Sequence, residues 1–404
     1  KDLTNENYFK YFTIYEKISL MIPSIIFGIM LFYFPKTTLI KLIGIIYVSA
    51  FIYINPEIGM AMAIFLLPLT QTLYTIGIIS ITFISMILNK DRFKLDIPTA
   101  FIPAVFFIIM AILATAFSIM KRDSFRTLPL YFAYFIFFYT ASIMFKNQKT
   151  LRRSIVCLFF SVSLVSLYGI YQYFFVKIPT AIAWVDVNQF PELSTRVYST
   201  LENPNVLAEY LGLLIPLILG YLWITKGLGK KIVILATLAL ATLCLILTFS
   251  RGAWVGLALS ILVFATLKEP RLFILLFIGI LVVPMFLPPV IIDRIASIGS
   301  LEDSSNAFRI SIWIASIRMI KDYWLTGLGL GLSAFSRVYR DYMLAGTPAV
   351  HSHNLYLQIG LEMGVAGIIA IIWMVSRGLS LAITGLKKIP WSFLQAGIIS
   401  ALVG

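Results

Sequence analysis

The two histidines of the chain, His351 and His353, lie two residues apart and are followed directly by Asn354. An apolar run begins at Leu355, so we expect these residues at a boundary between membrane and water. Because histidine titrates near neutral pH, a pair at such a boundary is suited to proton transfer. The alternative interpretation is structural, with Asn354 or Ser352 capping the next helix. A zinc site is disfavoured, since the chain has no third histidine to complete a ligand set.

Three arginines near expected helix ends could bind an anion: Arg196, Arg251 and Arg309. A guanidinium group matches phosphate oxygens and keeps its proton. The alternative is that these side chains reach to the bilayer edge, as most terminal arginines of membrane proteins do. Arg251 fits that alternative less well. It follows a long apolar run in a turn so tight that two helices must pack around it.

Helical periodicity places Arg309 on a narrow polar strip that it shares with Ser316, while Arg318 and Asp322 lie on the far side of the same helix. Two apolar stripes flank the strip, one made by Ile310, Ile314 and Ile317, the other by Phe308, Ile312 and Met319. The pattern predicts a helix buried on both flanks. Arg309 would then need an anionic partner, from the protein or from a ligand.

Several motifs of phosphate and ester chemistry are absent from the sequence. There is no Asp-x-Asp motif and no Gly-x-Ser-x-Gly motif. The glycines of residues 327–331 match neither nucleotide-binding pattern, so we expect tight turning or close packing there. If the substrate is a phosphate, arginines must therefore neutralise it, and we expect neither a metal nor another cofactor.

The elements that position these residues are apolar helices. Of 404 residues, 60% are hydrophobic and 12% are charged, which excludes an ordinary water-soluble globule. Both cysteines, Cys157 and Cys244, lie in apolar runs and are expected in the core. Because the chain stops in an apolar run at Gly404, we expect that part of the natural C-terminus is missing. We predict an all-α polytopic integral membrane protein with a single transmembrane domain over residues 1–404 and about 12–13 transmembrane helices. The helices are expected near residues 18–34, 38–54, 57–70, 72–89, 97–118, 128–146, 153–175, 205–224, 231–249, 252–267, 271–288, 355–375 and from 391 onward.

The charges between these helices predict the orientation. Five short loops carry Lys and Arg on the same side as the N-terminus, which the positive-inside rule makes cytoplasmic. The net charge of +14 is therefore read as a topology signal and not as a nucleic-acid surface. One basic loop is an exception and would lie outside, the loop with Lys121, Arg122 and Arg126. Two long connections, residues 176–204 and 289–354, also face outward and would form the active site.

Taken together, these motifs resemble the O-antigen ligase and O-antigen polymerase superfamily of bacterial envelope glycosyltransferases. The order is Ser250 and Arg251 at a helix end, Arg309 with Trp313 in a large outer loop, then His353 and Asn354. Nine residues later the sequence continues with Gly364, Val365, Ala366 and Gly367. The resemblance covers about residues 194–375, and the His-Asn and Gly-x-x-Gly element is its most specific part.

The resemblance implies a membrane glycosyltransferase (GT-C-like) architecture with a large helical outer loop, in the bacterial inner membrane. It implies an undecaprenyl-pyrophosphate-linked glycan donor and transfer, without metal, to an acceptor sugar such as lipid A–core. His353 would be the general base, and Arg251, Arg309 and Arg196 would hold the donor pyrophosphate. Asn354, Trp313, Gly364 and Gly367 would support the site. We expect His351 to point away from His353.

Two alternatives to an O-antigen ligase stay open. A polymerase would use the same donor to join repeat units, and its motifs overlap with those of a ligase. A flippase or transporter of lipid-linked sugars belongs to another class. Transporters usually carry ionisable residues near the membrane midplane. Here the apolar runs are almost free of charge, with Glu209 and Glu362 the main exceptions, and each lies near an outer end.

Overall fold

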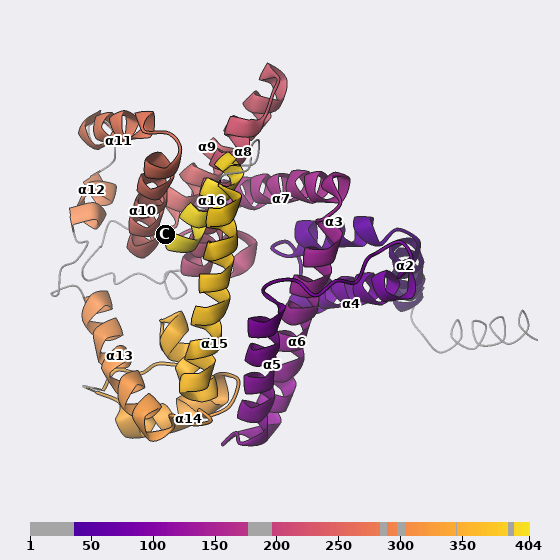
Figure 1. Cartoon of the computed structure of the whole chain (residues 1–404). Helices are drawn as coiled ribbons and strands as arrows, with labels where there is room; N and C mark the ends of the chain where they lie inside the picture. Colours follow the sequence, from indigo (N-terminus) through magenta and orange to yellow (C-terminus); the bar gives the residue numbers. More distant parts are fainter. Residues whose placement is uncertain (1–35, 177–195, 283–288, 297–303, 345, 387–391) are drawn as a thin grey trace, which may run out of the picture.

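The structure is a computed structural model, and it describes residues 36–176, 196–282, 289–296, 304–344, 346–386 and 392–404. Every regular element in these ranges is helical (Figure 1). The helices are α2 (Lys36–Ile54), α3 (Pro56–Leu66), α4 (Thr72–Leu88), α5 (Phe101–Ala116), α6 (Lys121–Met144), α7 (Gln148–Phe175), the short η3 (Ser199–Leu201), α8 (Pro204–Ile224), α9 (Leu228–Leu247), α10 (Arg251–Leu267), α11 (Arg271–Val282), α12 (Pro289–Ala296), α13 (Ser304–Asp322), α14 (Leu332–Tyr342), α15 (Leu355–Gly385) and α16 (Ser392–Val403).

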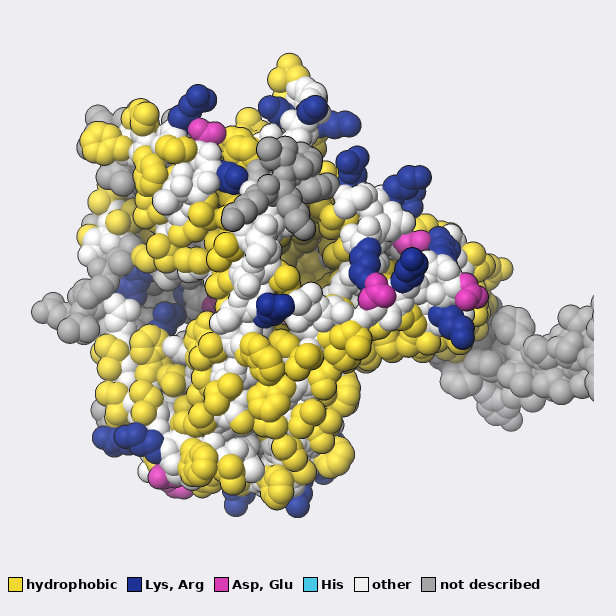
Figure 2. All heavy atoms as spheres, viewed as in Figure 1, with side chains coloured by type: hydrophobic (Ala, Val, Ile, Leu, Met, Phe, Trp, Pro, Cys, Tyr) yellow, Lys and Arg dark blue, Asp and Glu magenta, His cyan; other side chains and the backbone are white. Residues whose placement is uncertain are grey.

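Five of these helices are long and apolar enough to cross a membrane: α6, α7, α8, α9 and α15. The shorter apolar helices include α4, α5 and α10. Hydrophobic side chains cover much of the visible face, as expected for helices that meet lipid (Figure 2). The prediction of an all-α polytopic membrane protein is therefore confirmed. The predicted helix at residues 18–34 lies outside the described residues.

Predicted and observed helices agree along most of the described chain, but some helix ends differ. Helix α6 begins at Lys121, well before the predicted residue 128, and α15 continues to Gly385. Both extensions carry polar residues, which hydropathy excludes from a span although the backbone stays helical.

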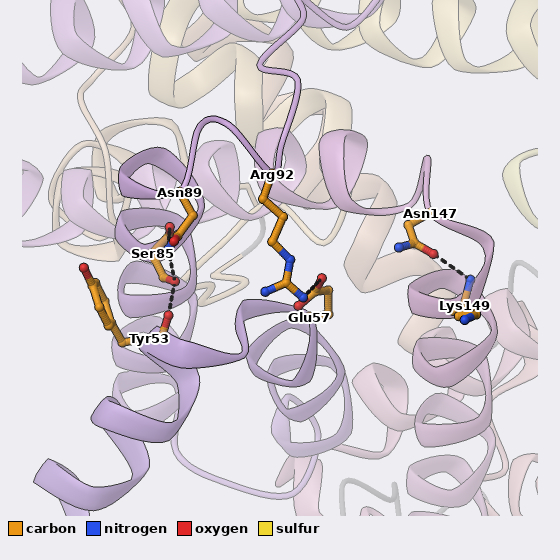
Figure 3. A network of polar contacts seen from close by, with 7 residues as sticks. All are labelled: Tyr53, Glu57, Ser85, Asn89, Arg92, Asn147 and Lys149. Atoms are coloured by element: carbon orange, nitrogen blue, oxygen red, sulfur yellow. Dashed lines mark hydrogen bonds and ion pairs between the residues drawn. The ribbon is translucent and has the colours of Figure 1, made fainter.

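At one end of α3 and α4 the Arg92 guanidinium contacts the Glu57 carboxylate at 2.6 Å, and the Ser85 hydroxyl donates to the Tyr53 carbonyl at 2.6 Å (Figure 3).

Helices α7, α8 and α9 build the core beside the candidate site. Val162, Leu207, Leu211 and Cys244 are fully buried there. Cys244 is a free thiol in the core, as expected, whereas Cys157 is half-buried. Close packing of these apolar side chains fixes the start of α8 and the end of α9, from which several site residues project.

Helix α13 corrects one prediction. Ile312 and Met319 are fully buried against α14 and α15, whereas Ile310, Ile314 and Ile317 are between 38% and 47% exposed. The expectation of two buried flanks is therefore wrong, because the described protein covers one flank and leaves the other open. Periodicity identifies both stripes as apolar but cannot tell a stripe that meets protein from one left for lipid.

A glycine-rich segment threads between two parts of the fold. Gly364 has φ 70° and ψ −170°, which kinks α15 and frees backbone groups on the inner side of the bend. Those groups bond the incoming segment: the Leu328 N–H donates to the Leu361 carbonyl at 2.6 Å, and the Val365 N–H donates to the Trp324 carbonyl at 2.8 Å. The prediction of close packing at these glycines is confirmed.

The opposite side of the same segment contacts the turn between α5 and α6. The Ile119 N–H donates to the Leu328 carbonyl at 3.0 Å, and the Ser124 hydroxyl donates to the Leu330 carbonyl at 2.9 Å. A side chain at Gly329 would collide with the Ser118 hydroxyl. The basic turn of Lys121 and Arg122 therefore lies beside α14, on the side that the sequence predicts to be outside.

Candidate active site

A cavity of about 350 Å³ opens between α8, α10, α13 and α16. Its polar lining consists of Asn205 and Glu209 from α8, Ser250 before α10, and Arg309 from α13. Most of the remaining lining is small or aliphatic, including Gly252 and Gly256. A cationic side chain thus faces a mostly apolar space, where an anionic group would interact with it strongly because little water screens the charges.

Arg309 lies between this cavity and the histidines. It lines the cavity, and its charge acts on both Glu209 and His353. Helix α13 positions it by burying Ile312 and Ala315 against the neighbouring helices. The guanidinium group therefore connects the two parts of the site that the sequence separates by more than a hundred residues.

The turn between α9 and α10 forms one wall of the site. Phe249 adopts φ 51° and is 3% exposed, with its ring centroid 6.4 Å from that of Trp254. This buried aromatic anchors an otherwise unfavourable left-handed turn. Ser250 follows as the N-cap residue and Arg251 begins α10, half-buried. The tight turn expected around Arg251 is thus present.

Arg196 lies behind the cavity wall and does not line it. It is 5% exposed, and its Nε donates to the Thr248 carbonyl at 2.8 Å. Its Nη2 donates to the Asn205 Oδ1 at 2.8 Å, an atom that also accepts from the Ser250 hydroxyl at 3.3 Å. These contacts favour a positioning role, because they hold the α9–α10 turn against the start of α8.

The second wall carries the histidine turn. Asn354 is the N-cap of α15, and its side chain accepts from the Leu357 N–H at 3.1 Å. Ser352 is fully buried and its hydroxyl donates to the Asn354 carbonyl at 2.8 Å. The capping interpretation is therefore confirmed for Asn354. His353 lies between these residues with φ 52°, and its exposed side chain takes no part in the cap.

The two histidine rings are in contact, with centroids 3.9 Å apart. The expectation that His351 points away is wrong, because the left-handed backbone at His353 turns its ring back over its neighbour. Partial burial of the His353 ring lowers its pKa to about 4, and the charges of His351 and Arg309 add to this effect. Burial also lowers the pKa of His351. Both rings therefore favour the neutral form.

The supporting residues differ in their surroundings. Trp313 is half-buried on α13, and its indole N–H meets no acceptor among the described residues. Gly364 makes the kink of α15, and a side chain there would meet the Trp324 carbonyl at 2.5 Å. Gly367 packs tightly against Met363 and Ile359. The glycines thus shape the helix that carries the histidine turn.

Sequence reasoning gave no role to a buried polar group next to this turn. Glu362 is 7% exposed in α15 and contacts Tyr131 of α6 and Gln358 of its own helix. A carboxylate within an apolar run was the available signal. Its partners could not be found from the sequence, because Tyr131 lies in a different helix far along the chain.

These features define a multi-pass α-helical membrane protein with an arginine-containing cavity next to a histidine pair. Residues 210–372 match the family model described as O-antigen ligase. This match covers the region that carries the motifs, and the resemblance to the O-antigen ligase and polymerase superfamily drawn from them is confirmed. The family is one of glycan-transferring enzymes whose partners are a lipid-linked glycan and an acceptor. The matched residues include Arg251, Arg309 and His353, whereas Arg196 precedes them. The curated proteins gave no match to this chain.

Proposed function

We propose that this protein is an O-antigen ligase that moves a glycan from an undecaprenyl-pyrophosphate donor to a sugar hydroxyl of an acceptor such as lipid A–core. The reaction takes place at the outer face of the bacterial inner membrane, and the N-terminus is cytoplasmic. The observation that carries the proposal is the position of α13, whose Arg309 lines the cavity while the ring of the preceding residue, Phe308, lies 6.1 Å from that of His353 between centroids. An anion-binding group and a base thus belong to one site.

In this proposal Arg309 and Arg251 bind the donor pyrophosphate. As the bond between the anomeric carbon and the pyrophosphate oxygen breaks, negative charge grows on that oxygen. Fixed guanidinium groups stabilise this charge better than water does, since they are oriented before the reaction begins. Arg196 contributes by holding Asn205 and Thr248 in place, and thereby the wall on which Arg251 begins.

His353 is the proposed general base. A neutral ring nitrogen accepts the proton of the acceptor hydroxyl while that oxygen attacks the anomeric carbon. Displacement in one step inverts the configuration at this carbon. A bound pyrophosphate offsets the charge of Arg309, which raises the pKa of His353 and makes it a stronger base when the donor is present.

The reaction is proposed to need no metal. Among the residues that the structure describes, no group of three His, Cys, Asp or Glu side chains is arranged to hold an ion. Arginines supply the positive charge that Mg²⁺ provides in many phosphate sites. Transfer should therefore continue in excess EDTA. Loss of activity in EDTA that Mg²⁺ or Mn²⁺ restores would contradict this part of the proposal.

The decisive experiment is an assay with purified protein, a lipid-linked glycan and two acceptors, lipid A–core and a second lipid-linked repeat unit. Product on lipid A–core supports a ligase, whereas joined repeat units would identify a polymerase. Movement of the intact donor across vesicles without any new glycosidic bond would identify a transporter. His353→Ala and Arg309→Ala protein, at matched membrane levels, provide the inactive controls.

The orientation is tested separately. Single cysteines at Ser304 and at Gly229, in protein lacking Cys157 and Cys244, should react differently with an impermeant reagent in intact cells. Ser304→Cys should be labelled, because residues 289–354 face outward in the proposal. Labelling of Gly229→Cys from outside would overturn the orientation.

A further inference from the structure

A buried network that the proposed chemistry does not use ends at the histidine turn. Glu362 lies 93% buried in α15, directly before the residues of the kink. One carboxylate oxygen accepts from the Tyr131 hydroxyl of α6, and the other accepts from the Gln358 Nε2 at 2.9 Å. Burial of a carboxylate costs free energy unless such donors satisfy it, so Tyr131 and Gln358 are what make this burial possible.

Gln358 links Glu362 to the backbone just before His353. Its Oε1 accepts from the Ser352 N–H at 3.0 Å. Because an amide has one accepting and one donating end, an acceptor at Glu362 decides which end faces Ser352. We name Tyr131, Glu362, Gln358 and the Ser352 N–H the Glu362 network.

The far end of the network contacts the glycine-rich segment. The Glu362 carbonyl accepts from the Gly329 N–H at 3.2 Å, inside the segment threaded past the kink. The near end lies at a strained turn, since His353 adopts φ 52° without being glycine. Such a backbone persists where its surroundings hold it.

We propose that the Glu362 network positions His353, by fixing the Ser352 backbone so that the His353 ring is held against His351 and toward Arg309. Tyr131, Glu362 and Gln358 are positioning residues, since they act on His353 through the Ser352 backbone and do not line the cavity. This inference rests on the proposed function for its effect on transfer, but not for its effect on the ring itself.

The network has a measurable consequence at the ring. The groups that face His353 are His351 on the same turn and Arg309 and Phe308 on α13. Glu209 lies beyond Arg309 and acts on it from the cavity. Releasing the turn moves the ring away from its cationic and apolar neighbours, so the pKa of His353 should rise toward its ordinary value near 6.5.

The experiment uses the full chain in nanodiscs with isotopically labelled histidine. Two histidines give two ring signals, and a His351→Asn sample assigns them. In Gln358→Leu protein the midpoint of His353 should rise by about one pH unit or more. Tyr131→Phe removes one hydrogen bond to Glu362 and should shift it less, in the same direction.

Gln172→Leu is the matched control. Gln172 is a buried glutamine whose Oε1, like that of the half-buried Gln358, accepts a backbone N–H, that of Ser199 at 2.7 Å, and Ser199 has φ 52°. This variant loses an equivalent hydrogen bond far from the histidines, so it should lower stability without moving the His353 midpoint. If Gln358→Leu does not fold, Gln358→Glu tests the same contact. It keeps an acceptor for Ser352 but sets a second carboxylate against Glu362.

The outcomes separate the two proposals. The network is refuted if folded Gln358 and Tyr131 variants keep the wild-type His353 midpoint. If His353→Ala abolishes transfer while those variants shift neither midpoint nor pH profile, the proposed function stands and the network does not. If the midpoint shifts but His353→Ala transfers normally, the network stands and the general-base role is wrong.

Discussion

Two turns of this molecule share a left-handed backbone conformation but differ in whether the side chain there is exposed. Each places a non-glycine residue in the left-handed region, Phe249 at φ 51° and His353 at φ 52°, directly before the N-cap of an apolar helix. The Phe249 ring is 3% exposed and packs into the core, whereas His353 is exposed. The same strained turn therefore hides an aromatic ring in one place and displays a titratable ring in the other.

The difference lies in what holds each turn. In the first turn the strained residue, Phe249, is itself packed into the core, and Arg196 donates a hydrogen bond to the carbonyl of the preceding residue, Thr248. In the second turn the anchors are the residues on either side, Ser352 and Asn354, so the strained side chain is released for another task. Arg309 shares the cavity lining with Ser250 of the first turn, and its charge acts on His353 of the second. A strained residue can carry chemistry when its neighbours supply the packing.

The largest expected effect tests this contrast directly. His353→Ala should lower the rate of transfer by about 10²–10⁴-fold with little change in thermal stability, because it removes a base from an exposed position. Phe249→Ala should instead destabilise the protein by about 3–5 kcal/mol, since it empties a packed site. Single-turnover transfer and thermal unfolding of both variants provide the measurements. Comparable loss of stability in both would remove the distinction between the turns.

The arginines should divide in the same way. Arg309→Ala should weaken donor binding and reduce transfer about a few-hundredfold, and Arg309→Lys should recover little, because a point charge cannot replace a bidentate fork. Arg196→Ala should mainly lower the unfolding temperature, as it leaves the buried Thr248 carbonyl without this donor. Donor affinity and unfolding are measured for each. Normal donor binding by Arg309→Ala would contradict its assignment to the pyrophosphate.

The pH profile sharpens the assignment of the exposed ring. A pKa of about 4 keeps about nine-tenths of His353 neutral at pH 5, whereas a pKa of 6.5 would leave about one-thirtieth neutral. The value of kcat/KM, which reports on ionisation of the free enzyme, should therefore persist at pH 5 and fall as the pH drops through about 4. The measurement is kcat/KM between pH 3.5 and 8. An acid limb near 6.5 would mean that the ring is not held beside Arg309 and His351.

The smallest expected effect is on stability, when the N-cap residues of α15 and α10 are replaced. Asn354→Ala should cost about 1 kcal/mol of stability, because it removes an acceptor from the first turn of α15. Ser250→Ala should cost less, since the Ser250 side chain makes no cap hydrogen bond in α10 and contacts Asn205. Denaturant midpoints of the two variants measure this. An equal loss of stability would show that both N-caps act alike.

His351 lies closer to His353 than the sequence suggested. Its ring lies against His353, so His351→Ala should change the pKa and packing of the proposed base and is no neutral control. A control for the histidine turn has to come from elsewhere, and Gln172 meets that need. Adjacent residues share an environment, and their side chains can meet wherever the backbone reverses.

Much of this protein is determined by the sequence alone. Apolar runs long enough to cross a membrane had to become helices, because a backbone in lipid must satisfy its own hydrogen bonds. The cap at Asn354, the close packing at residues 327–331 and the family of residues 210–372 all followed from local patterns. Each of these predictions could be made from short motifs of the sequence.

Tertiary structure decided what those patterns could not. Apolar stripes on α13 look alike in sequence, yet one meets protein and the other remains exposed. Tyr131 reaches Glu362 because a kink at Gly364 and a threaded glycine segment bring α6 and α15 together. Arg309 acts on both Glu209 and His353 because three helices converge around it. Contacts between distant segments depend on how whole helices pack, and local periodicity carries no information about which partner a given face will meet.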